Sequence, residues 1–161
     1  DLLDSLNAIS DKYNFPIIVS THPRTSIKLE KLDRNDLNSN IQFLKPIGFF
    51  DYNQMQKNAY CVISDSGTIT EESSILNFPS ITIRQAHERP EGMDEGTLIM
   101  SDLQSEKILQ SVEIILSQHN KDNPVTKQVE DYNGGNVSIK VARIIQSYTD
   151  YINRTVWRKY D

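Results

Sequence analysis

The chain has 161 residues, of which 17 are Lys or Arg and 22 are Asp or Glu. Its net charge of −5, without a long basic run, argues against a nucleic-acid partner, and no apolar stretch approaches the roughly 20 residues of a membrane helix. The length allows one sizeable core, and nothing marks a linker or a signal peptide, so we expect one domain. The single cysteine, Cys61, lies in an apolar run, which favours a buried thiol in a reducing compartment and hence a cytoplasmic protein.

The chain alternates helix and strand patterns. Apolar spacing and capping residues predict helices over 2–13, 27–32, 51–58, 68–76, 105–117 and 137–157, with Asp51 as one of the N-caps. Short apolar runs predict strands over 17–19, 41–44, 60–63, 81–83 and 97–100. This order predicts an α/β fold in which helices cover both faces of a parallel sheet.

The turn after the strand 60–63 is the most informative segment. Ser66 and Gly67 predict a tight turn, and Thr68-Ile69-Thr70-Glu71 fits the capping box that opens a helix. A helix N-terminus directly after a strand presents unpaired N–H groups and a positive dipole end, which bind phosphate in many α/β proteins. Residues 101–104 fit the same pattern, so the pattern alone leaves open a plain helix cap.

Short motifs give the chain a family resemblance: Asp65-Ser66-Gly67, Glu71-Glu72, Asn77-Phe78-Pro79 and Glu88-Arg89-Pro90-Glu91. The set and its spacing resemble the C-terminal half of the UDP-N-acetylglucosamine 2-epimerase family, and the resemblance extends to about Ser147. The wider segment from His87 to Gly96 is most similar to the branch that makes UDP-N-acetyl-L-fucosamine for bacterial capsule and O-antigen synthesis.

The resemblance implies the fold and the place of this chain in it. It implies a Rossmann-like domain, residues 1–161, as the C-terminal nucleotide-sugar-binding half of a two-domain GT-B-like enzyme, with the helix in 137–161 crossing to the N-terminal domain. The family's catalytic histidine segment and carboxylates precede this chain, so we expect no catalytic residue here and no activity from the chain alone. The whole enzyme is expected to be a homodimer without a cofactor. No Cys/His cluster has metal-ligand spacing, so we expect no metal.

The resemblance also assigns the turn and the following helix to the nucleotide. Ser66, Gly67 and Thr68 would contact the diphosphate of a UDP-sugar, although Thr68 stands where the family has a second glycine and its β-carbon narrows the approach. Glu71 fits the cap, and Glu72 points about a third of a turn away, free to accept hydrogen bonds from the ribose hydroxyls, as the matching glutamate does in the family. A solvated helical carboxylate is the alternative for Glu72.

Further residues follow from the same resemblance. Arg89 offers a planar fork for phosphate with Glu88 as its orienter, or else forms an ordinary ion pair with Glu88 or Glu91. Tyr52 matches the aromatic ring that stacks on uracil, or is a half-buried tyrosine at a helix start. His22 follows a strand at its carboxyl end, where ligands collect in open α/β sheets, or is polar surface.

Two other functions remain open. A glycosyltransferase donor-binding domain would share the fold and the ribose-binding glutamate, but the Glu-Arg-Pro-Glu motif is foreign to it. A stand-alone nucleotide-binding module would need no catalytic residues in any domain.

Overall fold

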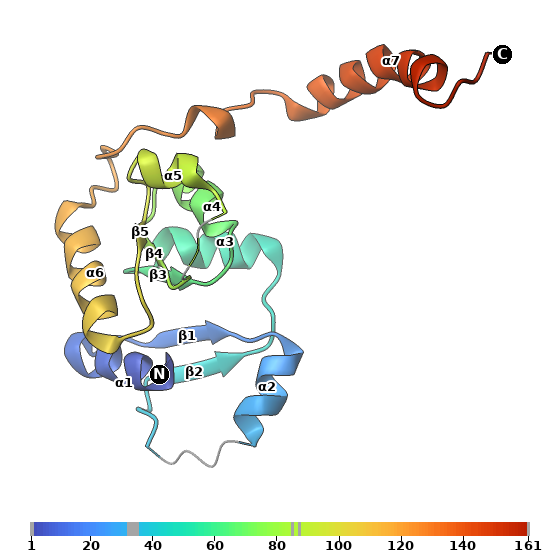
Figure 1. Ribbon diagram of the computed structural model, residues 1–161. Coiled ribbons are helices and arrows are strands. Elements are labelled where there is room, and N and C mark those ends of the chain that lie inside the picture. The colour runs from blue at the N-terminus through green and yellow to red at the C-terminus, as the bar shows by residue number, and fades with distance from the viewer. Residues whose placement is uncertain (1, 32–35, 85, 87, 161) are drawn as a thin grey trace. The chain divides into compact units, whose positions relative to one another are not determined.

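The computed structural model describes residues 2–31, 36–84, 86 and 88–160. Contacts divide it into two units, 1–129 and 130–161. Helices and strands alternate along the first unit (Figure 1). Its elements are α1 (Leu2–Tyr13), β1 (Ile17–Ser20), α2 (Pro23–Glu30), β2 (Ile41–Leu44), α3 (Phe49–Asn58), β3 (Val62–Ser64), α4 (Ile69–Leu76), β4 (Ser80–Thr82), α5 (Pro90–Asp94), β5 (Ile99–Met100) and α6 (Ser105–Gln118). The second unit holds the short 3-10 helix η1 (Glu130–Tyr132) and α7 (Val137–Thr155).

The paired strands of the first unit run parallel, as predicted. β1 pairs with β2, with Ile17 opposite Ile41. β4 lies between β3 and β5, and the two groups form separate hydrogen-bonded sheets. In a parallel sheet the carboxyl ends of the strands share one edge, so the turn after β3 and the loop after β4 meet there.

Apolar clusters cover both faces of the β3–β4–β5 sheet. One cluster comprises Ile69, Phe78 and Leu98, and the other Ile81, Ile108 and Val112. The consecutive residues Val62 and Ile63 pack against different clusters, because neighbouring strand residues point to opposite faces. Helices therefore lie on both faces: α4 and α5 on the first, α1 and α6 on the second (Figure 1). Cys61 packs on the second cluster, and burial raises the pKa of its thiol to about 12.

Two helices begin elsewhere than the sequence pattern predicts. α2 begins at Pro23, with His22 as its N-cap, because proline suits the first helical turn and His22 Nδ1 accepts a hydrogen bond from the Arg24 N–H at 3.3 Å. The predicted end, Leu32, lies outside the described residues. α3 has Gly48 rather than Asp51 as its N-cap, and Asp51 lies in its first turn.

The second unit consists mainly of α7. Asn136 Oδ1 accepts a hydrogen bond from the Ile139 N–H at 3.3 Å and so caps this helix. The helix carries a strong apolar stripe that includes Ile144, Tyr148 and Tyr151, and none of its residues is buried. Within the described part of the chain, neither α7 nor any other helix combines the length and apolarity that crossing a membrane demands.

Candidate functional site

The turn between β3 and α4 is closed mainly by bonds within itself. Ser66 Oγ and Thr68 Oγ1 lie 3.0 Å apart, and the N–H groups of Ile69 and Thr70 donate to the carbonyls of Ser66 and Gly67. Thr68 is the N-cap of α4 but makes no side-chain capping bond, so the predicted capping box is wrong. In a capping box the Glu71 side chain would accept from the Thr68 N–H, which here donates to Ser66 Oγ at 3.4 Å instead, and positive charge near the turn comes from another segment.

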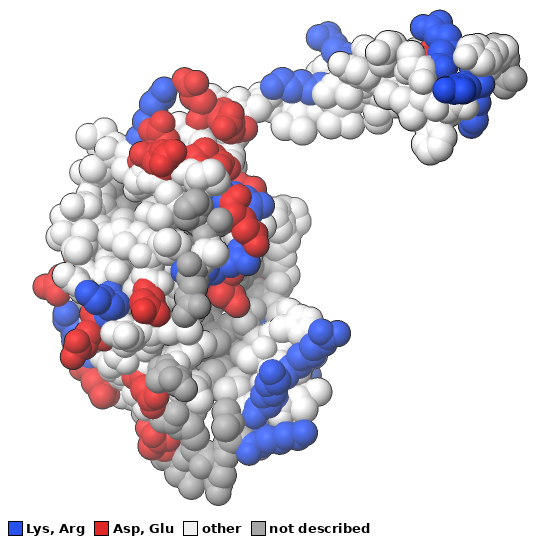
Figure 2. Space-filling view, viewed as in Figure 1, with Lys and Arg blue, Asp and Glu red and all other residues white. Residues whose placement is uncertain are grey.

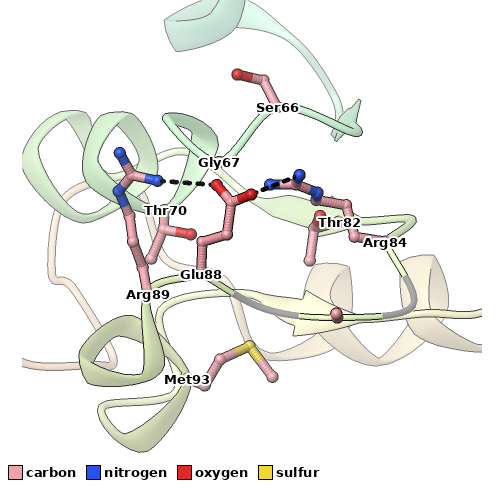
Figure 3. Close-up of a pocket in the computed structure, with 9 residues that line it drawn as sticks. Ser66, Gly67, Thr70, Thr82, Arg84, Glu88, Arg89 and Met93 are labelled. Carbon is pink, nitrogen blue, oxygen red and sulfur yellow. Dashed lines mark hydrogen bonds and ion pairs between the residues drawn. The ribbon is translucent and has the colours of Figure 1, made fainter.

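That charge comes from two arginines in the loop after β4. Arg89 Nε lies 2.5 Å from Glu71 Oε1, and Arg84 Nη2 lies 2.8 Å from Glu88 Oε1. Arg89 Nη1 is 3.8 Å from Glu88 Oε2, so the Glu88 carboxylate points between the two guanidinium groups (Figure 3). We call these four residues the arginine cluster. Glu71, assigned to the cap by sequence, is instead the nearer acidic partner of Arg89, ahead of Glu88.

The arginine cluster is partly exposed and keeps its charges. A hydrogen bond from Arg84, together with its charge, lowers the pKa of Glu88. The side chain of Glu88 is 59% exposed and that of Arg89 is 27% exposed, so solvent reaches both. On the face drawn in Figure 2, acidic and basic side chains lie next to each other around α4 and α5, whereas those described around α2 are basic.

Gly67 is where the turn meets the arginine cluster. A β-carbon at this position would overlap Arg89 Nη1 and would lie 3.0 Å from Glu88 Oε2 and 3.3 Å from Arg84 Nη1. The pocket between turn and cluster has a volume of about 10 Å³. That is room for about one water molecule, and the Glu88 side chain forms part of the wall. Thr70, Thr82, Ala86 and Met93 also line it, and Figure 3 labels Thr70, Thr82 and Met93.

A second group of side chains joins α3 to α4. Gln56 Nε2 donates to Glu72 Oε2 at 2.5 Å, and Gln56 is only 3% exposed. Burial raises the pKa of Tyr52 and the charge of Glu72 raises it further, against a hydrogen bond from Gln56 that lowers it. The charge of Asp65, which follows β3, also raises the pKa of Tyr52. We call Tyr52, Gln56 and Glu72 the α3–α4 contact.

The predicted site residues fall into three places. Ser66, Gly67 and Arg89 line the pocket, and Thr68 stands beside it in the same turn. Glu72 and Tyr52 belong to the α3–α4 contact. His22 caps α2 and does not line the pocket. His87, the first residue of the segment that resembles the fucosamine branch, lies outside the described residues.

Arg84 and Gln56 were missed as site residues by sequence reasoning. Arg84 directly follows the strand pattern 81–83, and a position just after a parallel strand was already the argument for His22. Gln56 stands four residues after Tyr52 on the same helix, so helical spacing alone places the two side chains on one face. Among the described residues, no group of three or more His, Cys, Asp or Glu is placed to hold a metal ion.

Comparison with known proteins places this site in a family. The sequence model of the UDP-N-acetylglucosamine 2-epimerase family matches residues 1–146. The UDP-N-acetylglucosamine 2-epimerase of Methanococcus maripaludis is 37% identical over 147 residues, which are 87% of this chain and 38% of that protein. That of Methanocaldococcus jannaschii is 34% identical over 77% of this chain and 35% of its own length.

Solved structures agree. The structure of UDP-N-acetylglucosamine 2-epimerase from Rickettsia bellii matches with a TM-score of 0.90 and 54% identity, over 98% of this chain and 43% of that one. The Methanocaldococcus jannaschii UDP-GlcNAc 2-epimerase, solved in complex with UDP-GlcNAc and UDP, matches with a TM-score of 0.77 and 32% identity, over 89% of this chain and 39% of that one.

The fold is therefore the Rossmann-like α/β fold of GT-B-like nucleotide-sugar enzymes. The chain belongs to the UDP-N-acetylglucosamine 2-epimerase family. It spans about two fifths of the length of the relatives it matches, between 35% and 38% of the two curated proteins above. Family membership favours the epimerase interpretation over the glycosyltransferase and stand-alone alternatives.

Proposed function

We propose that this chain is the C-terminal, UDP-sugar-binding part of a non-hydrolysing UDP-N-acetylhexosamine C2 epimerase. One observation carries the proposal: a glycine turn with two arginines against it lies next to a helix pair that presents Glu72 and Tyr52. Cationic forks beside a close backbone approach suit a diphosphate, and a carboxylate beside an aromatic ring suits a nucleoside.

The arginine cluster would bind the diphosphate by exchange. Glu88 lies between Arg84 and Arg89, where its carboxylate takes the position that suits a phosphate group. Exposed ion pairs contribute little to stability, so a ligand phosphate can displace Glu88 at small cost. The Ser66 and Thr68 hydroxyls of the turn face the same ligand in this proposal.

The α3–α4 contact would hold the nucleoside. Glu72 accepts hydrogen bonds from the ribose hydroxyls, and the Tyr52 ring stacks on uracil. His22, at the carboxyl end of β1, borders the sugar end of the ligand in this proposal.

The reaction itself needs groups that we assign to the N-terminal domain of the whole enzyme. One base removes the C2 proton while UDP leaves C1 with the bonding electrons, which gives a glycal-like intermediate. A proton then returns to C2 on the opposite face and UDP re-adds at C1. The present chain holds the UDP through the elimination and orients it for return.

The finer identity rests on the loop 87–96, whose sequence is most similar to the branch that forms UDP-N-acetyl-L-fucosamine for capsule or O-antigen synthesis. We assign the chain to that branch. The whole enzyme is then a cytoplasmic homodimer, and α7 crosses to the N-terminal domain, which gives its apolar stripe a partner.

Calorimetric titration of the chain with UDP and with ADP tests the binding function. We expect weak binding of UDP, because one domain offers only one wall of the ligand's cleft, and weaker binding of ADP. Equal affinity for the two nucleotides would overturn the proposal. Conversion of a UDP-N-acetylhexosamine by the chain alone would contradict the assignment of the catalytic groups to another domain.

A further inference from the structure

Gln56 is the one described residue of α3 that is classed as buried, and it is polar. A buried amide destabilises a fold unless its hydrogen bonds are made. Here they are made on one end of the amide only: Nε2 donates to Glu72 and a hydrogen bond links Gln56 to Tyr52, while Oε1 is buried and has no hydrogen-bond partner among the described residues. An apolar side chain of similar size would fill this position without that cost, so stability does not explain the glutamine.

The hydrogen bond from Gln56 to the Glu72 carboxylate gives a reason for the buried amide. Glu72 lies near the start of α4, and a glutamate there has several rotamers open to solvent. The 2.5 Å bond from Gln56 selects one of them and ties it to α3, the helix that also carries Tyr52. Gln56 meets Glu72 from α4 and Tyr52 from α3 itself, and the charges of Glu72 and of Asp65, from the turn after β3, act on Tyr52.

We propose that Gln56 is a positioning residue, which fixes the Glu72 carboxylate toward the ribose hydroxyls of a bound uridine nucleotide. The inference rests on the proposed function, because it assumes that Glu72 binds the ribose. Preorganising one carboxylate saves the ligand the cost of ordering it, so the effect appears in affinity for ligands that carry the hydroxyls.

The main test compares UDP with 2′,3′-dideoxy-UDP on the full chain carrying Gln56→Met, which keeps the volume and removes the donor. We expect UDP affinity to fall roughly three- to tenfold, the usual effect of one hydrogen bond, and dideoxy-UDP affinity to stay within twofold of wild type. The melting temperature should stay the same or rise, because the unpartnered Oε1 is removed. Gln54→Met, on the exposed side of the same helix, is the matched control and should change none of these values.

A second variant guards against a trivial loss of packing. Gln56→Glu places two carboxylates together, and such a pair keeps one proton at raised pKa. At pH 5 the protonated Glu can donate to Glu72, and at pH 8 the two charges repel. UDP affinity relative to wild type should therefore recover as the pH falls from 8 to 5.

The results distinguish failure of the positioning role of Gln56 from failure of the ribose-binding role of Glu72. If Glu72→Gln leaves UDP affinity unchanged, or lowers UDP and dideoxy-UDP affinity equally, the ribose assignment fails. If Glu72→Gln lowers UDP affinity alone but Gln56→Met does not, the ribose assignment stands and the positioning role fails. Equal losses for UDP and dideoxy-UDP in Gln56→Met, together with a lower melting temperature, would show that Gln56 only packs.

Discussion

The two sides of the candidate site hold their carboxylates in opposite ways. In the arginine cluster, Glu88 is 59% exposed and forms ion pairs with Arg84 and Arg89, which dissolved salt can screen. In the α3–α4 contact, Glu72 is held by a neutral amide that is 3% exposed. Exposed ion pairs exchange partners at little cost, whereas a buried amide keeps its geometry. The charged side is thus suited to trade one anion for another, and the neutral side to present a fixed acceptor.

Closing the space at Gly67 should break the charged side most completely. A methyl group in Gly67→Ala overlaps Arg89 Nη1 and crowds Glu88, so the arginine cluster must shift. Because these neighbours are the ends of flexible side chains, we expect the melting temperature to stay within a few degrees. UDP affinity should fall roughly ten- to a hundredfold, the worth of one charge-assisted bond or more.

Gly48→Ala is the matched control, because among the described residues a β-carbon there meets only Asp51 Oδ2, at 3.9 Å. Titration of both variants with UDP, alongside thermal melts, makes the measurement. Unchanged UDP affinity in Gly67→Ala would place the phosphates elsewhere.

Removal of one arginine should distinguish the two sides. Arg89→Ala should weaken UDP binding by about 1.5 to 3 kcal/mol and leave uridine binding nearly unchanged, because only UDP carries phosphate. Glu72→Ala should weaken both ligands. The comparison requires titration of each variant with UDP and with uridine.

Lys12→Ala removes an exposed ion pair with Glu113, 3.0 Å long, and controls for loss of a surface charge. If Arg89→Ala lowers thermal stability and leaves UDP affinity intact, the ion pairs of Arg89 with Glu71 and Glu88 are its whole role.

Added salt should weaken ligand binding at the arginine cluster and leave binding at the α3–α4 contact nearly unchanged. Screening weakens interactions between exposed charges, so UDP affinity should fall severalfold between about 0.05 and 0.5 M NaCl, while uridine affinity stays nearly constant. Titrations of both ligands over this range give the slopes. Parallel slopes would mean that the arginine cluster does not face the phosphate.

The smallest effect on the site is expected from the second unit. Deletion of residues 151–161 should leave the first unit folded and UDP affinity within twofold, because the two compact units are distinct. The structure shows α7 as a continuous helix to Thr155, so we expect the full chain to self-associate through Tyr151 and Trp157 rather than to fray after Ser147. Sedimentation should give a dimer for the full chain and a monomer for the shortened one. A shortened chain that fails to fold would show that the helix is integral to the first unit.

The positions of most helices and strands along the chain could be predicted from the sequence because they depend on local pattern. Apolar spacing located α1, β2 and α6 to within a residue. The starts of α2 and α3 were missed, because His22 and Gly48 are capping choices that apolar periodicity does not report. The family resemblance assigned Ser66, Gly67 and Arg89 to one site, and the structure places all three around the same pocket, because the segments after neighbouring parallel strands meet at one edge.

What the sequence could not decide is which side chain meets which. Helical geometry shows that Glu71 and Glu72 diverge, but only the packing of α4 against α3 and the loop after β4 directs Glu71 to Arg89 and Glu72 to Gln56. These pairs are 18 and 16 positions apart, and no local propensity encodes a contact at that separation. The sequence alone determined where the helices and strands lie and which residue types follow each strand, because these depend on local pattern. The partner of each carboxylate depends on how the helices pack on the sheet.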